Sequence, residues 1–393
     1  MTSPSERRRL RFRLKGLLLL CGAPLAGSAP LAAQHPSSTP DVLRTPAGLT
    51  EVGVLSNAAY RIDVPADWNH ELVVYYHGYA EQPVEYHLAA RPVALVEQML
   101  ARHYAVAESG YSRTGWALPQ AYPETEALRR YFGRTYGTPV ETFLAGQSMG
   151  GALVALTLEI NPKPYAAGLD LCGSVGASYD EYQRRFAWRA AFDYYFPGAL
   201  PPVTRIPSSY EDSYENKQHL LDLLRANPSA ASSMRQLTAL HTDAELARLM
   251  SYVTFSLMDM EQRAHGNPFD NRNVIYTGTG DTSTGDWELN DGVKRYTADP
   301  RARLYLMQHY TPSGRLQRPM LALHTVYDPI VPASSLVDYQ REVDQAGFGR
   351  NYVQQYVHRD GHCTFSAEEI GRAFDELVGW AHHQGTPAPG LLP

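Results

Sequence analysis

A serine flanked by glycines is the first feature of this sequence that could do chemistry. Residues 146–150 read Gly-Gln-Ser-Met-Gly and match the pattern G-x-S-x-G around Ser148. In this pattern the serine lies on a sharp turn between a strand and a helix, and the glycines leave room where the two elements nearly touch. TFLA before the motif is typical of a strand, and GALVALTLEI after it is typical of a helix. This context predicts that Ser148 is a nucleophile, and not merely part of a turn.

Alternating strand and helix patterns surround the motif. Between about residues 70 and 175, apolar runs such as ELVVYYHGY, HYAVAESGY and AAGLDLCGSVG alternate with segments of helical periodicity. The alternation stops over residues 176–315, which are mostly helical and rich in tyrosine, and it resumes near residue 318 with RPMLALHTVYDP. The alternation predicts a mainly parallel sheet with helices on both faces. An interruption of roughly 140 residues is too long for a loop, so we expect an inserted helical cap.

The motif and its setting resemble the α/β-hydrolase superfamily over roughly residues 65–385. The resemblance implies a serine, an acid and a histidine in that chain order. Asp328 in LHTVYDPIVP and His362 in DGHCTF each follow a strand pattern, which makes them the expected acid and base. Three weaker candidates for these roles lie within or at the end of strand patterns: Asp170, His324 and His358.

The resemblance also implies an oxyanion hole formed by two main-chain N–H groups. One belongs to the residue after the serine, Met149, and the other to Tyr79 in the segment His-Gly-Tyr that follows VVYY. Four side chains near these positions are candidates for a substrate pocket: His77, Tyr111, Trp116 and Gln147. For residues 109–120, which include two of the four, a purely structural turn is the alternative.

Two cysteines outside the N-terminal segment, Cys172 and Cys363, follow elements of the expected fold. Cys172 ends an apolar strand pattern, and Cys363 directly follows His362. In the fold that the resemblance implies, both positions lie at the edge of the sheet near the serine, so we expect a disulfide that holds the histidine loop. Two separate buried thiols are the alternative. Some tannase and feruloyl esterase relatives tie this loop to a cysteine beside the serine, where this chain has Gln147.

The first 33 residues have the layout of a secretory signal peptide. RRRLRFRLK is basic, GLLLLCGAPLAGSAPLA is short and apolar, and PLAAQ offers a cleavage site near Ala33. We therefore expect a secreted or periplasmic protein without a membrane span after cleavage. A lipid anchor on Cys21 is disfavoured because Leu20 stands where a small residue is expected. The expected organisation is a signal peptide (1–33), a linker (34–48), a core in two parts (49–175 and 316–385), a helical cap (176–315) and a flexible tail (386–393).

Charge and composition exclude some function classes. The chain of 393 residues has 35 Lys and Arg and 41 Asp and Glu. Removal of residues 1–33 takes away six basic residues and one acidic residue, which leaves 29 basic and 40 acidic residues. A chain this acidic has no general attraction for nucleic acid. No cofactor or metal site is predicted: GTGDTSTGDWELND (278–291) lacks the EF-hand spacing, and we interpret it as an acidic loop of the cap.

These features predict a secreted serine hydrolase, most simply a carboxylic-ester hydrolase acting on a small-molecule or polymeric ester. An aminopeptidase or amidase with the same triad is an alternative, and a non-catalytic binding protein on the same fold is another. The peptidase alternative requires acids that hold a substrate amine, for which the cap offers Glu211, Asp212 and Glu215. The cap aromatics could contact an apolar substrate or only pack the cap; they include Tyr194, Tyr195, Phe196 and Trp287.

Overall fold

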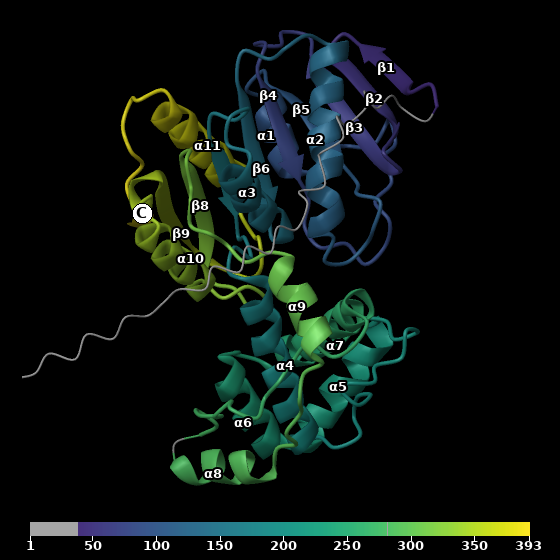
Figure 1. The fold of residues 1–393 in the computed structure, drawn as a ribbon, viewed down its shortest axis with the longest axis vertical. Coiled ribbons are helices and arrows are strands. Elements are labelled where there is room, and N and C mark those ends of the chain that lie inside the picture. Colours follow the sequence, from purple (N-terminus) through teal and green to yellow (C-terminus); the bar gives the residue numbers. More distant parts are fainter. Residues whose placement is uncertain (1–37, 281) are drawn as a thin grey trace, which may run out of the picture. The chain divides into compact units, whose positions relative to one another are not determined.

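A ten-stranded sheet is the centre of the computed structural model, which describes residues 38–280 and 282–393. The strand order in the sheet is β1-β2-β3-β5-β4-β6-β7-β8-β9-β10. Figure 1 shows the sheet with its flanking helices. The strands are Asp41–Thr45 (β1), Gly48–Leu55 (β2), Ala58–Pro65 (β3), Leu72–Tyr76 (β4), Ala105–Ser109 (β5), Thr142–Gln147 (β6), Gly168–Leu171 (β7), Met320–Tyr327 (β8), Tyr352–Asp360 (β9) and Gly390–Leu391 (β10). The predicted signal peptide lies outside the described residues.

The direction of the strands confirms the predicted α/β-hydrolase fold. β1, β2 and β3 pair antiparallel, and β3 pairs antiparallel with β5. All pairs from β5 through β4, β6, β7, β8 and β9 to β10 are parallel. β4 lies between β5 and β6, so the chain reverses its direction of winding there, and ligand sites of such sheets form beyond the carboxyl ends of the strands.

Helices cover both faces of the sheet because its inner strands are apolar on both sides. Every residue of β4 (LVVYY) is buried. One face packs on α2 (Leu118–Thr135), α3 (Met149–Ile160) and α10 (Ser334–Gln345). The other face packs on α1 (Ala94–Leu100) and α11 (Ala367–Ala381). Alternate β4 side chains enter the two separate clusters, so the strand is held between two layers of helices.

The helical segment between β7 and β8 is the predicted cap, here called the insertion (residues 176–315). Its helices are α4 (Ser178–Tyr195), α5 (Tyr214–Ala226), α6 (Pro228–Thr238), α7 (Asp243–Ala264), α8 (Ser283–Gly292) and α9 (Pro300–Gln308) (Figure 1). α7 begins with a capping box in which the Thr242 side chain and Glu245 bond each other's main-chain N–H groups. The predicted apolar stripe of α7 is buried, which confirms it as a packing face: Leu246, Leu249, Met250, Val253 and Leu257.

Three segments differ from the sequence expectation. Residues 41–45 of the predicted linker form β1, an edge strand whose five residues are all exposed and therefore carry no apolar alternation. In the predicted flexible tail, residues 390–391 pair with β9 as β10. Residues 283–291 of the predicted acidic loop lie in α8. These segments bury few side chains, so they carry little of the apolar periodicity from which strands and helices are predicted.

None of the helices in the described ranges combines the length and apolarity needed to cross a membrane.

Candidate active site

Ser148 lies on the sharp turn between β6 and α3, as the motif predicts. Its backbone has φ +56° and ψ −122°, a conformation that non-glycine residues rarely adopt. The flanking glycines are required sterically. A β-carbon at position 146 would lie 2.2 Å from the main-chain oxygen of Gly150, and one at position 150 would lie 2.1 Å from that of Tyr76. The turn therefore presents the partly exposed serine beyond the carboxyl end of the strand.

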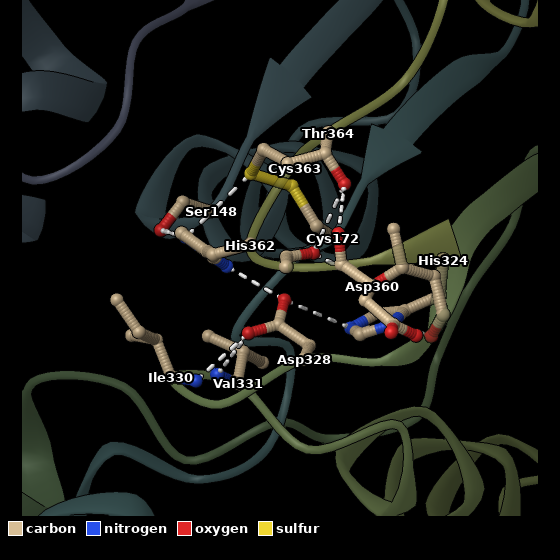
Figure 2. The surroundings of a disulfide bond; sticks show 12 residues. Ser148, Cys172, His324, Asp328, Ile330, Val331, Asp360, His362, Cys363 and Thr364 are labelled. Atoms are coloured by element: carbon tan, nitrogen blue, oxygen red, sulfur yellow. Dashed lines mark hydrogen bonds and ion pairs between the residues drawn. A yellow bond between two sulfur atoms is a disulfide. The ribbon is translucent and has the colours of Figure 1, made fainter. Parts of the chain in front are cut away.

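The structure brings Ser148, His362 and Asp328 together in one hydrogen-bonded chain (Figure 2). His362 Nε2 lies 2.8 Å from Ser148 Oγ, and His362 Nδ1 lies 2.7 Å from Asp328 Oδ2. Asp328 follows β8, and His362 follows β9. The other carboxylate oxygen of Asp328 accepts the N–H groups of Ile330 at 2.8 Å and Val331 at 3.0 Å.

These contacts decide the charge of Asp328. Burial favours its neutral form, but the hydrogen bond from His362 and the two main-chain N–H groups hold the pKa of Asp328 below its usual value. The carboxylate is therefore charged at neutral pH. It accepts a hydrogen bond from the Nδ1–H group of His362. The unprotonated Nε2 then faces the serine as a proton acceptor.

The three weaker candidates occupy other places. His324 is fully buried, and its Nε2 lies 4.0 Å from Asp328 Oδ2 (Figure 2). Burial lowers the pKa of His324, so it remains neutral behind the carboxylate. His358 is exposed on β9. Asp170 is fully buried, and burial raises its pKa to about 8. A β-carbon on Gly151 would lie 1.9 Å from the Asp170 carboxylate, so this side chain packs under the start of α3.

The expected disulfide between Cys172 and Cys363 is present (Figure 2). Their α-carbons are 5.4 Å apart and 191 positions apart in sequence. Cys172 directly follows β7 and is fully buried, and Cys363 Sγ lies 3.5 Å from His362 Nε2. The bond therefore ties the loop that carries His362 to the end of a central strand. The alternative of two separate thiols is wrong.

The loop after β4, residues 77–80, runs beside Ser148. A β-carbon on Gly78 would lie 3.3 Å from the β-carbon of Ser148, so the main chain passes directly next to the serine. Met149 is the first residue of α3, and the first N–H groups of a helix have no acceptor within the helix. The predicted oxyanion residues thus flank the serine from two elements.

The four predicted pocket residues differ in their surroundings. His77 stacks on Tyr111 with ring centroids 3.9 Å apart, and the Tyr111 hydroxyl donates to the main-chain oxygen of His77 at 3.2 Å. Burial lowers the pKa of His77 to about 4, so the ring is neutral at pH 7. Trp116 is buried and donates its indole N–H to Ser178 at 3.0 Å. Tyr111 and Trp116 have the bonded, buried character of a structural turn, whereas Gln147 is partly exposed beside the serine.

The insertion reaches the acid side of the site through contacts that sequence reasoning missed. The His241 ring stacks on Tyr327, the residue before Asp328, with centroids 3.9 Å apart. The Tyr327 hydroxyl accepts the His241 N–H at 3.2 Å and donates to Glu245 at 3.2 Å. No local pattern marks such a pair, because its members lie more than 80 positions apart in sequence.

The predicted acidic and aromatic residues of the insertion do not form one group. Glu211 and Glu215 are exposed, and Asp212 is paired with Lys217 at 2.8 Å. Phe196 is buried, whereas Trp287 is 64% exposed. Tyr194 and Tyr195 contact each other edge to face.

Two groups in the described ranges bring potential metal ligands together. Cys172 and Cys363 are used in the disulfide, so His362 is left without thiolate partners. The other group is Glu71, Glu141 and His382, whose ligand atoms lie within 4.8 Å of one another. Glu71 and Glu141 precede β4 and β6, at the opposite end of the strands from Ser148. Within the 278–291 segment, the Asp286 carboxylate accepts the main-chain N–H groups of residues 278 and 279.

Comparisons with known proteins give a likeness of fold. No protein-family model matches the chain, and no curated protein matches its sequence. Candida antarctica lipase A has 14% identity, with 88% of this chain and 80% of that chain covered and a TM-score of 0.47. Feruloyl esterase B from Aspergillus oryzae has 12% identity, with 89% and 88% covered and a TM-score of 0.47. Est1E from Butyrivibrio proteoclasticus has 13% identity, with 88% and 100% covered and a TM-score of 0.41. These likenesses say nothing about function, which must be argued from the geometry of the site.

Proposed function

We propose that the chain is a secreted serine hydrolase that cleaves carboxylic esters through an acyl-enzyme intermediate. The observation that carries the proposal is the hydrogen-bonded chain from Ser148 through His362 to Asp328, with distances of 2.8 and 2.7 Å. Secretion is supported by the signal-peptide pattern of residues 1–33 and by the Cys172–Cys363 disulfide, because such bonds persist in oxidising compartments.

In the first half-reaction, Ser148 Oγ attacks the ester carbonyl carbon while His362 Nε2 takes the serine proton. The Asp328 carboxylate fixes the histidine tautomer and stabilises the imidazolium. The tetrahedral intermediate then expels the alcohol, which leaves with the proton from His362, and the acyl group remains on Ser148.

In the second half-reaction, water attacks the acyl-enzyme and His362 takes a proton from it. The intermediate collapses, the carboxylic acid leaves, and the proton returns to Ser148 Oγ. The residues end in the state in which they began, so the cycle needs no cofactor.

The oxyanion of both intermediates would be bound by the main-chain N–H groups of Tyr79 and Met149. Support comes from the close approach of Gly78 to Ser148 and from the position of Met149 at the start of α3, where the helix dipole favours negative charge. One such donor typically contributes a factor of about 10² to 10³ in rate.

The amide-cleaving alternative has weaker support. It requires free carboxylates near the site to bind a substrate amine. Of the three insertion acids considered for this role, Asp212 is already paired with Lys217, and no contact of the described residues brings the exposed Glu211 or Glu215 to the triad. An ester substrate needs no such group, which favours the ester proposal.

A release assay separates the candidate functions. We expect the mature protein to hydrolyse p-nitrophenyl acyl esters, with no comparable release from aminoacyl p-nitroanilides. Preferred release from the anilides would replace the esterase proposal with the peptidase alternative. Release from neither class of substrate would support the non-catalytic binding protein.

A further inference from the structure

The 77–80 loop is joined to a second loop, which follows β5. The Gly115 N–H donates to the main-chain oxygen of Ala80 at 2.7 Å, and the two residues form an isolated antiparallel bridge. β4 and β5 are parallel neighbours, so both loops leave the same end of the sheet. The bridge makes the position of Tyr79 depend on the residues around Gly115.

Asp259, on α7 of the insertion, contacts both loops. Its Oδ2 accepts the main-chain N–H of Trp116 at 2.9 Å and lies 3.4 Å from the Tyr79 hydroxyl. Gly115 has φ +74°, and a β-carbon there would lie 2.3 Å from the same Oδ2. The carboxylate therefore packs directly on the backbone of the second loop while it accepts from the side chain of the first.

Further contacts fix this arrangement. Arg263 Nε donates to Asp259 Oδ1 at 2.8 Å, and the same guanidinium donates to the main-chain oxygen of Thr114. The Tyr79 ring packs edge-on against Tyr252 of α7, with centroids 5.7 Å apart. Burial raises the pKa of Tyr79 well above its usual value, so the hydroxyl stays protonated and can donate to Asp259.

We propose that Asp259, on α7 of the insertion, is a positioning residue. It holds the main-chain N–H of Tyr79 where this group can bind the oxyanion. The inference rests on the proposed function, since it uses the oxyanion role of Tyr79. Asp259 acts through its contacts with Tyr79 and Trp116, which hold the loop beside Ser148 in a fixed position relative to α7. A displacement of about 1 Å in such a group can cost about 100-fold in rate, so one carboxylate can control turnover without touching the substrate.

The test compares Asp259→Ala with Asp193→Ala. Asp193 is a matched control because it is also a partly buried carboxylate of the insertion, paired with an arginine four positions away, Arg189. With p-nitrophenyl butyrate, we expect Asp259→Ala to lower kcat by about 100-fold and to leave KM within about threefold of wild type. We expect Asp193→Ala to lower the melting temperature to a similar extent and to change kcat by less than about threefold.

Two milder variants keep the proposal testable if Asp259→Ala does not fold. Asp259→Asn keeps an oxygen acceptor for the Trp116 N–H and should hold kcat within about tenfold of wild type. Tyr79→Phe removes only the hydroxyl that Asp259 faces, and it should lower kcat by about tenfold with KM and melting temperature near wild type.

The outcomes separate this inference from the proposed function. A wild-type protein that does not turn over the ester contradicts the proposed function. An active wild type with kcat unchanged in Asp259→Ala, or reduced no more than in Asp193→Ala, overturns the positioning role alone. Wild-type kcat in Tyr79→Phe would also overturn it.

Discussion

Removal of the Cys172–Cys363 disulfide should lower both stability and turnover. The bond closes a loop of 191 residues, and the chain-entropy model for a loop of that length gives about 5 kcal/mol at 25 °C. This is the upper end of measured disulfide effects, so we expect Cys172→Ser/Cys363→Ser to lose about 2–5 kcal/mol of unfolding free energy. For a chain of 393 residues the loss corresponds to a fall of about 3–6 °C in melting temperature.

Turnover should fall as well, because Cys363 directly follows His362 and its sulfur lies 3.5 Å from His362 Nε2. Without the bond, the histidine loop keeps the hydrogen bond between His362 and Asp328 and the hydrogen bonds of Gly361 with β8, but Cys363 loses its link to the end of β7. We expect kcat for p-nitrophenyl butyrate to drop by about 10- to 100-fold, with KM little changed.

The assay is thermal unfolding followed by circular dichroism, with kcat measured on the same samples. Reductant is the internal control: it should bring the wild type to the level of the double serine variant and leave that variant unchanged. A double variant that melts within about 2 °C of wild type and keeps its kcat would refute the structural role of the bond.

Two further changes test the electrostatics of the site. Asp328→Asn should lower kcat by about 10⁴-fold, because the amide cannot favour the required tautomer of His362. Steady-state kinetics measure this loss, and a loss below about tenfold would point to another acid. Asp170 has a folded pKa of about 8, above the unfolded value of about 3.9, so the folded state holds one extra proton between these pH values. Asp170 should therefore contribute a fall in stability of about 1.4 kcal/mol per pH unit as pH rises through this range, and the pH slope of Asp170→Asn in denaturant titrations at pH 5 to 8 should differ from that of wild type by this amount. Equal slopes in the two proteins would show that Asp170 is not protonated in the fold.

The turn that carries Ser148 and the chain order of the candidate catalytic residues could be predicted from the sequence because their signals are local. The glycines around Ser148 are dictated by main-chain contacts within the strand–turn–helix unit and with the neighbouring strand end. Asp328 and His362 each follow an apolar strand pattern, and a parallel sheet brings such ends to one edge. Cys172 and Cys363 also follow strand patterns or the histidine at this edge, so the disulfide could be expected for the same reason.

Contacts between the insertion and the core could not be predicted. Asp259 and Tyr79 are 180 positions apart, and His241 and Tyr327 are 86 apart. Such pairs depend on how the insertion packs against the core. This packing leaves no periodic pattern in the sequence of either segment. The edge strands β1 and β10 were missed for a related reason, since main-chain pairing at an exposed edge requires no apolar pattern.

Labelling with a fluorophosphonate tests whether Ser148 is the nucleophile. We expect the folded wild type to gain one adduct, located at Ser148 by peptide mapping, and to lose ester turnover in proportion to labelling. Ser148→Ala should gain no adduct while keeping the wild-type melting profile. A folded wild type that stays unlabelled, or equal labelling of the alanine variant, would contradict the assignment of Ser148 as the nucleophile.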